Sequence, residues 1–169
     1  MSTPRAHLIR CLRDAYAMEK HSETMLGAQA CRLGDDAHLR IHIQHHLHET
    51  LGQQAMLASC LARLGSGPSL IKGMAGEITA FSQVVIGMTM RDEVVKGAMS
   101  TYAFEHAEIA AYTALVSVAR AAGDLETTRI CERILQQEVE MAGWLSRHIP
   151  ATVTRYLMGV ARKRDEATR

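Results

Sequence analysis

The sequence predicts an all-α protein built as a four-helix bundle, with one long connection between the second and third helices. Apolar residues make up 47% of the 169 residues, whereas aromatic residues make up only 4% and Pro occurs three times. This composition suits long helices rich in Ala, Leu and Met, because strands favour β-branched and aromatic residues. At this length we expect a single domain, residues 1–169, around one hydrophobic core.

Capping residues and glycine breaks predict the helix boundaries. Thr3 and Pro4 form a helix start, since a capping hydroxyl precedes a proline that suits the first turn. Glycine followed by aspartate, which ends one helix and caps the next, recurs at Gly34 and Gly123. Apolar residues at spacings of three and four fill the segments between these breaks. The predicted helices cover residues 4–32, 36–64, 91–122 and 124–148.

The connection at residues 66–90 is too long for a tight turn, and glycines interrupt its apolar pattern. We expect a crossover that contains a short helix, because two closely linked helix pairs joined by a long segment match the one-crossover bundle. A core bundle over residues 4–148 would then be followed, after Pro150, by a short terminal helix through Arg162. A helical-repeat solenoid or a coiled coil fits less well, since no repeat of about 30–45 residues and no unbroken heptad tract occurs.

Charge and cysteine content argue against several classes of partner. Lys and Arg number 19 against 18 Asp and Glu, so the chain has no basic field to neutralise a nucleic-acid backbone. No apolar run approaches the ~18 residues of a membrane span. The cysteines, Cys11, Cys31, Cys60 and Cys131, form no CxxC pair and are expected to be reduced thiols. We expect a cytoplasmic protein without a nucleic-acid or membrane partner.

The inward face of every predicted helix carries a glutamate. Positions spaced alternately three and four apart form the face that a bundle helix turns to the core. On the second helix this seam is predicted to be Leu39, His42, His46, Glu49, Gln53, Met56 and Cys60. The other three seams contribute Glu19, Glu105, Glu108 and Glu138. No seam contains a Lys or Arg that could neutralise these acids.

Counting residues from the loops places the acids at one level of the bundle. Glu19 and Glu49 each lie 15 residues from Gly34. In the second helix pair, Glu105 and Glu138 lie 18 and 15 residues from the intervening glycine. The mismatch of three residues corresponds to ~4.5 Å along a helix. A short repeat supports this pairing, because the sequence Tyr-Ala-Met-Glu that ends at Glu19 returns as Tyr-Ala-Phe-Glu ending at Glu105.

Several carboxylates that meet in a core need protons, basic partners or metal, because burial and mutual repulsion disfavour their charge. Without basic residues on the seams, metal is the simplest answer. Carboxylates with a nearby histidine are the ligand set of di-iron and di-manganese bundles, and the lack of thiolate spacing argues against structural zinc. We therefore predict two metal ions, iron with manganese as the alternative. The predicted ligands are Glu19, His46, Glu49, Glu105, Glu108 and Glu138.

Each of these residues also has a structural interpretation. His46 could be a polar core residue that bonds to Glu49, and Gln53 is more readily a hydrogen-bond partner of a ligand than a ligand itself. Tyr16 and Tyr112 could support the site, although plain packing is the commoner role of aromatic residues in a bundle. A helical interaction domain without metal would require the acids to be protonated or linked through water.

Four segments resemble a known family. These are Leu12 to Lys20, His46 to Thr50 with Gln53, Phe104 to Ala110, and Gln137 to Pro150. Together they resemble the YciE/YciF family of ferritin-like stress proteins, YciE more closely than YciF, over residues 8–157. The resemblance implies a ferritin-like fold, homodimers, a link to stress responses and a metal site formed by the six residues that the seams select.

The sequence departs from the usual ferritin pattern, in which a histidine lies three residues after a glutamate. Gly52 and Met141 occupy the corresponding positions after Glu49 and Glu138. Two functions therefore remain open from the sequence. One is a redox-active di-metal protein that reacts with oxygen or peroxide. The other is a non-enzymatic structural or interaction bundle whose acidic core binds metal weakly or not at all.

Overall fold

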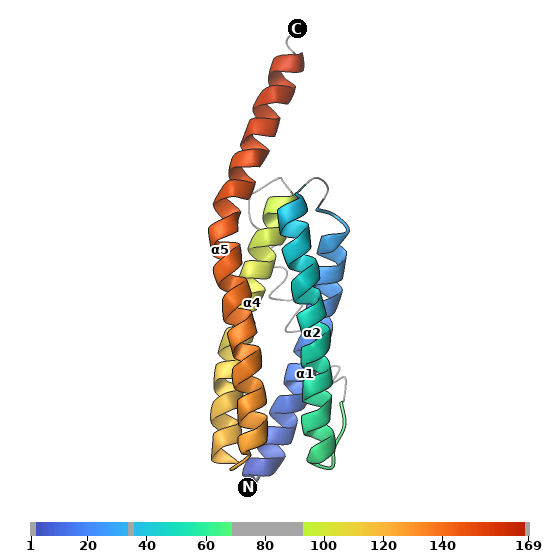
Figure 1. Ribbon diagram of the computed structural model, residues 1–169, viewed down its shortest axis with the longest axis vertical. Coiled ribbons are helices and arrows are strands. Elements are labelled where there is room, and N and C mark those ends of the chain that lie inside the picture. The colour runs from blue at the N-terminus through green and yellow to red at the C-terminus, as the bar shows by residue number, and fades with distance from the viewer. Residues whose placement is uncertain (1–2, 34–35, 69–92, 168–169) are drawn as a thin grey trace.

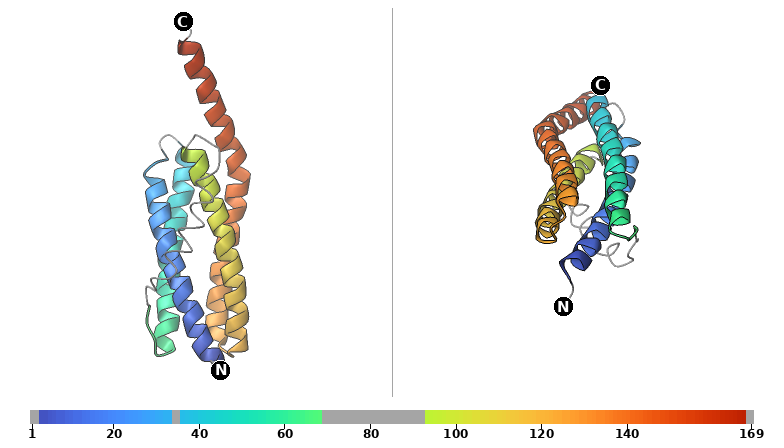
Figure 2. Two further views of the ribbon diagram at one scale, coloured as in Figure 1. Left: turned by 180° about the vertical axis from the view of Figure 1, so that it is seen from behind. Right: turned by 60° about the horizontal axis from the view of Figure 1, so that its bottom comes forward.

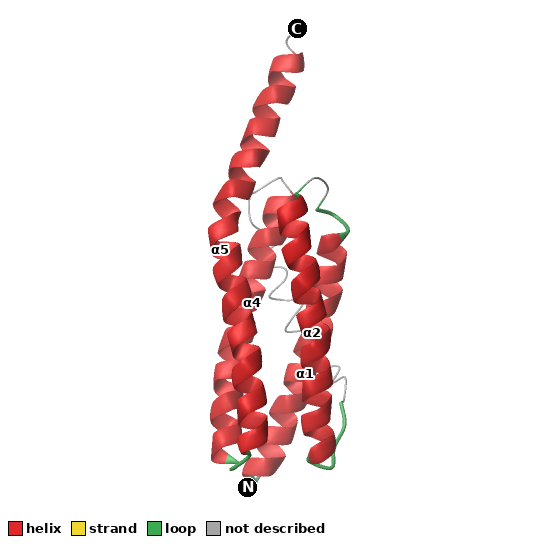
Figure 3. Ribbon diagram, in the orientation of Figure 1, coloured by secondary structure: helices red, strands yellow, loops and turns green. Residues whose placement is uncertain are grey.

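The computed structural model describes residues 3–33, 36–68 and 93–167. These ranges contain four helices and no strand (Figure 3), which confirms the predicted fold class. The helices are α1 (Pro4–Ala30), α2 (Ala37–Arg63), α4 (Glu93–Ala121) and α5 (Leu125–Ala167). The short helix expected within residues 66–90 falls almost entirely outside the described residues. Within the described ranges, no helix is long and apolar enough to cross a membrane.

The four helices form two antiparallel hairpins that pack side by side. α1 packs on α2 and α4 packs on α5, while α1 also contacts α4 and α2 contacts α5. Every packed pair is antiparallel, whereas α2 and α4 run in the same direction on opposite sides of the bundle (Figures 1 and 2). The end of α2 and the start of α4 consequently lie at opposite ends of the bundle (Figure 1). This is the topology expected of a bundle with one crossover.

The helix ends use the capping groups that the sequence indicated. The hydroxyl of Thr3 accepts a hydrogen bond from the backbone nitrogen of Ala6 at 3.2 Å, ahead of the proline that opens α1. Asp124 accepts one from the backbone nitrogen of Thr127 at 3.0 Å and so caps α5. Gly123 has a φ of 71°, a left-handed conformation that ends α4 and that other residues adopt with strain.

The core has two apolar clusters that flank a polar centre. One cluster includes Leu12, Leu57 and Tyr112, and the other includes Leu39 and Leu145. Full burial of such side chains contributes ~1.5–3 kcal/mol each, which helps to offset the cost of polar groups between them. The buried polar residues of this centre are Glu19, Ser22, His46, Thr50, Gln53, Thr101, Glu105, Glu108 and Glu138.

The buried seam of α2 differs from the predicted one at alternate positions. It comprises Leu39, Ile43, His46, Thr50, Gln53, Leu57 and Cys60. His42 is exposed, and Glu49 and Met56 are half-buried, so these three residues lie at the edge of the seam. A helix with 3.6 residues per turn allows a step of either three or four from Leu39. The step of four buries the apolar Ile43 instead of His42, which lowers the cost of burial.

The predicted break at Pro150 is wrong, because α5 is continuous to Ala167 and includes this proline. Two contacts made by residues after Pro150 support the helix there. Thr154 Oγ1 donates a hydrogen bond to the carbonyl oxygen of Pro150 at 2.9 Å, and Arg155 forms an ion pair with Asp36 at the start of α2. These contacts offset the hydrogen bond that proline cannot donate. The helix therefore extends beyond the ends of the other three (Figure 1).

Candidate metal centre

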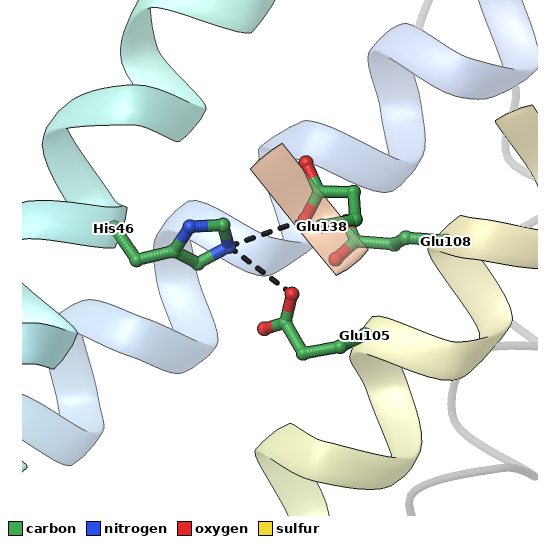
Figure 4. Close-up of side chains that lie close together, drawn as sticks. All are labelled: His46, Glu105, Glu108 and Glu138. Atoms are coloured by element: carbon green, nitrogen blue, oxygen red, sulfur yellow. Dashed lines mark ion pairs between the residues drawn. The ribbon is translucent and has the colours of Figure 1, made fainter. Parts of the chain in front are cut away.

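Four potential ligands converge in the polar centre of the bundle. His46 comes from α2, Glu105 and Glu108 from α4, and Glu138 from α5 (Figure 4). One ligand atom from each side chain lies within 4.8 Å of the others. His46 is 1% exposed and the three glutamates are 0% exposed, so the group is closed to bulk water. Such a set of carboxylate oxygens and one imidazole nitrogen has the composition of an iron or manganese site.

The imidazole of His46 is held at both nitrogens by carboxylates. Nδ1 lies 3.0 Å from Glu49 Oε2, and since an ionised carboxylate only accepts, this contact assigns the hydrogen to Nδ1. Nε2 lies 3.2 Å from Glu105 Oε2 and 3.2 Å from Glu138 Oε2, at angles that give no hydrogen bond. The second nitrogen therefore faces the acids. A histidine oriented in this way by a carboxylate is typical of metal-bound histidines.

Two glutamines connect Glu138 to its surroundings. Gln53 Nε2 donates to Glu138 Oε1 at 2.5 Å and to Gln137 Oε1 at 3.2 Å, which is the supporting contact expected of Gln53. Gln53 Oε1 is buried without a partner. Sequence reasoning did not identify Gln137 as part of the site. The sequence signal that could have identified Gln137 was its position next to Glu138, which lies level with Gln53 on the facing helix α2.

Glu19 lies beside the group and is held by Tyr112. The Tyr112 hydroxyl donates a hydrogen bond to Glu19 Oε1 at 2.5 Å, and both side chains are 0% exposed. Glu19 Oε2 has no partner. Tyr112 thus does more than fill space, which is the role that the sequence favoured for it. Tyr16, by contrast, is half-buried and packs against the apolar cluster that contains Tyr112.

Burial raises the pKa values of three buried acids, Glu105, Glu19 and Glu108. It raises the pKa of Glu105 to about 7, while the neighbouring His46 opposes this shift. Burial and the charge of Glu138 raise the pKa of Glu19 well above its ordinary value. The pKa of Glu108 is also well above its ordinary value because of burial and then the charge of Glu19. In the metal-free chain, protons therefore remain on acids that would ionise in water.

The pKa of His46 shifts in the opposite sense to that of an isolated buried histidine. Burial lowers this pKa, but the carboxylates of Glu105, Glu138 and Glu49 outweigh burial and hold it well above the ordinary value. The metal-free imidazole consequently retains a proton among the acids. A cation bound at Nε2 would replace that proton, because metal ligands must give up their protons on binding.

Unpartnered oxygen atoms gather at the same place. The buried carboxylate oxygens without a hydrogen-bond partner are Glu19 Oε2, Glu105 Oε1 and Oε2, Glu108 Oε1 and Oε2, and Glu138 Oε2. Each buried atom left without a partner costs ~1–3 kcal/mol. Divalent cations coordinate several carboxylate oxygens together and would satisfy these atoms in one step. The residues present therefore fit a metal centre.

The six predicted ligands fall into three groups according to where they lie. His46, Glu105, Glu108 and Glu138 form the converging group. Glu19 is buried next to them, where its charge raises the pKa of Glu108. Glu49 is 23% exposed and contacts His46 instead of the acids. Hydrogen bonding from His46 lowers the pKa of Glu49, and a weaker hydrogen bond from Gln137 contributes to this shift.

A four-helix bundle with one crossover and a buried cluster of glutamates and histidine has the architecture of the ferritin-like bundles. Residues 3–158 match the family described as "Domain of unknown function (DUF892)", and the chain belongs to this family.

Solved structures that are similar to this chain include the following three. A protein from Xanthomonas campestris pv. campestris is 43% identical over 94% of this chain and 98% of that one, with a TM-score of 0.80. The E. coli stress protein YciF is 24% identical over 91% and 99% of the two chains, with a TM-score of 0.76. A bacterioferritin with a diiron site from Desulfovibrio desulfuricans is 23% identical over 93% and 88%, with a TM-score of 0.73. The last two likenesses establish the fold.

Proposed function

We propose that this protein is a di-metal carboxylate protein of the YciE/YciF stress-protein type, closest to YciE, which holds two iron ions, or manganese, in its core. The observation that carries the proposal is the set of unpartnered carboxylate oxygens around His46 Nε2. Protons or a cation must balance this charge, because the seams supply no Lys or Arg. The diiron site of the similar bacterioferritin supports iron as the metal.

Each side chain has a role in this proposal. His46, Glu105, Glu108 and Glu138 would be ligands, which their convergence in the core supports, and Glu19 and Glu49 would complete the set for two ions. Glu49 also orients His46 through Nδ1. Gln53 and Tyr112 each donate a hydrogen bond that fixes a carboxylate, on Glu138 and Glu19 respectively. We assign no catalytic role to an individual residue.

The proposed activity is oxidation of iron linked to oxygen or peroxide. Bound iron(II) would supply the electrons for this reaction, which the side chains of the site cannot supply. The residues around the site exclude water, since His46, Glu105 and Glu138 are almost fully buried. Glu105 can hold or release a proton near neutral pH, because burial raises its pKa to about 7.

A second candidate function is a non-enzymatic structural or interaction bundle. The raised pKa values of Glu19 and Glu108, which follow from burial, favour it, because protonated acids can remain in a core without metal. The hydrogen bond from Tyr112 to Glu19 would then serve stability alone. The two candidates differ in whether freshly purified protein contains metal and whether added iron is oxidised.

Metal loading of site variants tests the proposal. Glu138→Gln keeps the side-chain shape but removes a charge, so anaerobic loading with iron(II) should give clearly less iron per chain than the two ions of the parent. Glu49→Gln should lower the stoichiometry as well. The metal-free variants should keep their helicity and be equally or more stable, since repulsion among acids is relieved. The measurements are elemental analysis, circular dichroism and absorbance after an oxygen pulse.

The matched control is Glu132→Gln, a carboxylate on α5 that forms a surface ion pair with Arg120. Its iron stoichiometry should equal that of the parent. Unchanged iron binding in both Glu49→Gln and Glu138→Gln would show that the acids do not form the metal site. Inert bound metal after the oxygen pulse would favour the second candidate.

We also propose a homodimer that works in the cytoplasm. Exposed apolar side chains on α2 and α5 support pairing through helix faces, including Ile41 at 61%, Leu51 at 45% and Val139 at 44% exposure. The cysteines in the described residues are free thiols, which supports a reducing compartment. YciF is a stress protein, and its likeness to this chain supports the proposed link to stress.

A further inference from the structure

A surface pocket opens between α2 and α5 directly beside the buried acids. Its volume is ≈ 240 Å³. It is lined by His42, His45, His46, Glu49, Gln137, Glu140, Met141, Trp144 and Arg147. His46 belongs to both the pocket and the converging group, so the pocket ends against one residue of the candidate metal centre.

Three side chains of the pocket are of types that bind metals, and their exposed fractions decrease from the surface inward. His45 is 71% exposed, Glu49 is 23% exposed and His46 is 1% exposed. Glu49 Oε2 lies 3.6 Å from His45 Nδ1 and 3.0 Å from His46 Nδ1, so one carboxylate connects the outer and inner imidazoles. Imidazoles and carboxylates are the groups that bind first-row divalent metals.

A second polar connection leads from the pocket to the acids. Gln137 lines the pocket and accepts a hydrogen bond from Gln53 at 3.2 Å. The same Gln53 nitrogen lies 2.5 Å from Glu138 Oε1, and the oxygen of Gln53 is buried without a partner. A buried amide oxygen in this state is a suitable transient ligand for a cation, because it can donate electron density without carrying a charge.

A different groove, between α1 and α4, lacks these properties. It has a volume of ≈ 270 Å³ and is lined mainly by aliphatic side chains such as Met18, Leu115 and Val118. None of the six predicted ligands lines it. Its ligand-type side chains, His7, Cys11 and Asp14, do not belong to the converging group, so this groove shares no residue with the candidate metal centre.

We propose that the pocket between α2 and α5 is the loading route of the metal centre. A divalent cation is first held by Glu49 and His45, and then passes between His46 and Gln137 into the carboxylate cluster. This inference rests on the proposed di-metal function. Glu140 at the pocket attracts the cation, whereas Arg147, whose guanidinium lies against Gly143, opposes its approach.

The test reverses charges at the pocket without altering a predicted ligand. Metal-free protein is mixed with Co²⁺ alone in a stopped-flow instrument, and the visible absorption of bound Co²⁺ is followed. Glu140→Lys should slow uptake roughly three- to tenfold at low ionic strength, and Arg147→Glu should accelerate it by a similar factor. Both effects should shrink as salt is added, because the Debye length falls to ~3 Å at 1 M.

Two controls on α5 carry the same charge changes away from the pocket. Glu132→Lys and Arg133→Glu alter the net charge equally, and neither residue lines the pocket. Their uptake rates should stay close to that of the parent. The Co²⁺ stoichiometry at equilibrium, measured by elemental analysis after gel filtration, should be the same in all five proteins, and circular dichroism should show equal helicity.

The uptake rates and the equilibrium stoichiometry together test the proposed loading route. Opposite changes confined to the two pocket variants support the loading route. Equal rates in pocket and control variants, with normal stoichiometry, would overturn the route and leave the metal centre standing. Failure of the parent to bind Co²⁺ at equilibrium would overturn the route together with the proposed function.

Discussion

Tyr112 stabilises Glu19 through a single hydrogen bond in the interior, and its removal has a predictable cost. In Tyr112→Phe, Glu19 Oε1 would lose the donor that lies 2.5 Å away. A buried acceptor left without its partner costs ~1–3 kcal/mol, so the metal-free variant should lose stability of this order in urea denaturation. Tyr102→Phe on the same helix is the matched control, because this tyrosine is only half-buried. Equal losses in both variants would contradict the role given to Tyr112.

Glu105 should make the metal-free protein less stable as pH rises. Burial raises its pKa to about 7 from an ordinary value of 4.5, so between these values the folded chain holds a proton that the unfolded chain has lost. The stabilisation is complete below the unfolded pKa and is lost as pH rises through the folded one. The raised pKa of His46, where the carboxylates outweigh burial, acts in the same direction.

Replacement of this acid should therefore flatten the pH dependence. Metal-free Glu105→Gln is expected to lose less thermal stability than the parent between about pH 5 and about pH 8. The measurement is the midpoint of thermal unfolding by circular dichroism in a chelating buffer. The control Glu132→Gln, which replaces a surface carboxylate, should show the parental change in unfolding midpoint with pH. A variant at Glu105 with an unchanged slope would show that its titration does not control stability.

The seam pattern predicts which acids lie inside, but it does not resolve single positions at the edge. Glu105 and Glu138 are fully buried where a spacing of three or four places them. On α2 the structure buries Thr50, whereas the predicted seam placed the preceding residue, Glu49, toward the core. The difference arises earlier in the helix, where Ile43 instead of His42 faces the core. Only the packing of the facing helices decides which residue does so. The hydrogen bond between Gln53 and Gln137 depends on side-chain geometry in the same way.

At the scale of whole elements, Asp36 joins the start of α2 to the far part of α5. Its Oδ1 accepts a hydrogen bond from the backbone nitrogen of Leu39 at 3.1 Å, and Arg155 and His148 approach Oδ2. Burial raises the pKa of Asp36, but the backbone hydrogen bond and the charge of Arg155 outweigh this and lower it. One carboxylate therefore both caps one helix and anchors another.

Two substitutions separate these roles. Asp36→Ala should cost ~1–2 kcal/mol, because the cap and the ion pair are both lost. Asp36→Asn retains a capping oxygen and should cost no more than ~1 kcal/mol, the value of a partly exposed ion pair. Thermal unfolding in low and high salt measures the difference. If the two variants were equally stable, capping by Asp36 would contribute nothing.

Helix boundaries were predictable where the chain itself supplies the signal. Thr3, Asp36 and Asp124 cap the helices that follow them, and Gly123 ends α4. The continuation past Pro150 was not predictable, because local rules count the missing amide hydrogen as a break. The compensating contacts with Asp36 come from a segment more than a hundred residues earlier, and no local pattern contains them.

On the scale of the whole molecule, the proposed homodimer is open to direct measurement. Light scattering coupled to gel filtration should give twice the chain mass of 18.6 kDa. The physical reason is the exposed apolar area on the helices, which water disfavours. Leu51→Glu should weaken the dimer if that part of α2 lies in the interface, whereas Leu125→Glu near the end of the bundle serves as a comparison. A monomer or a large cage would reject the proposal.

The site lies on the boundary between the two helix hairpins. The hairpin of α1 and α2 brings His46, whereas the hairpin of α4 and α5 brings Glu105, Glu108 and Glu138. Neither hairpin alone can enclose these groups. In the absence of a cation, breathing motions of the molecule should therefore open this boundary before either hairpin separates into single helices. A bound cation would cross-link the two hairpins. Amide hydrogen exchange along the facing surfaces of α2 and α5 should therefore slow as metal is added.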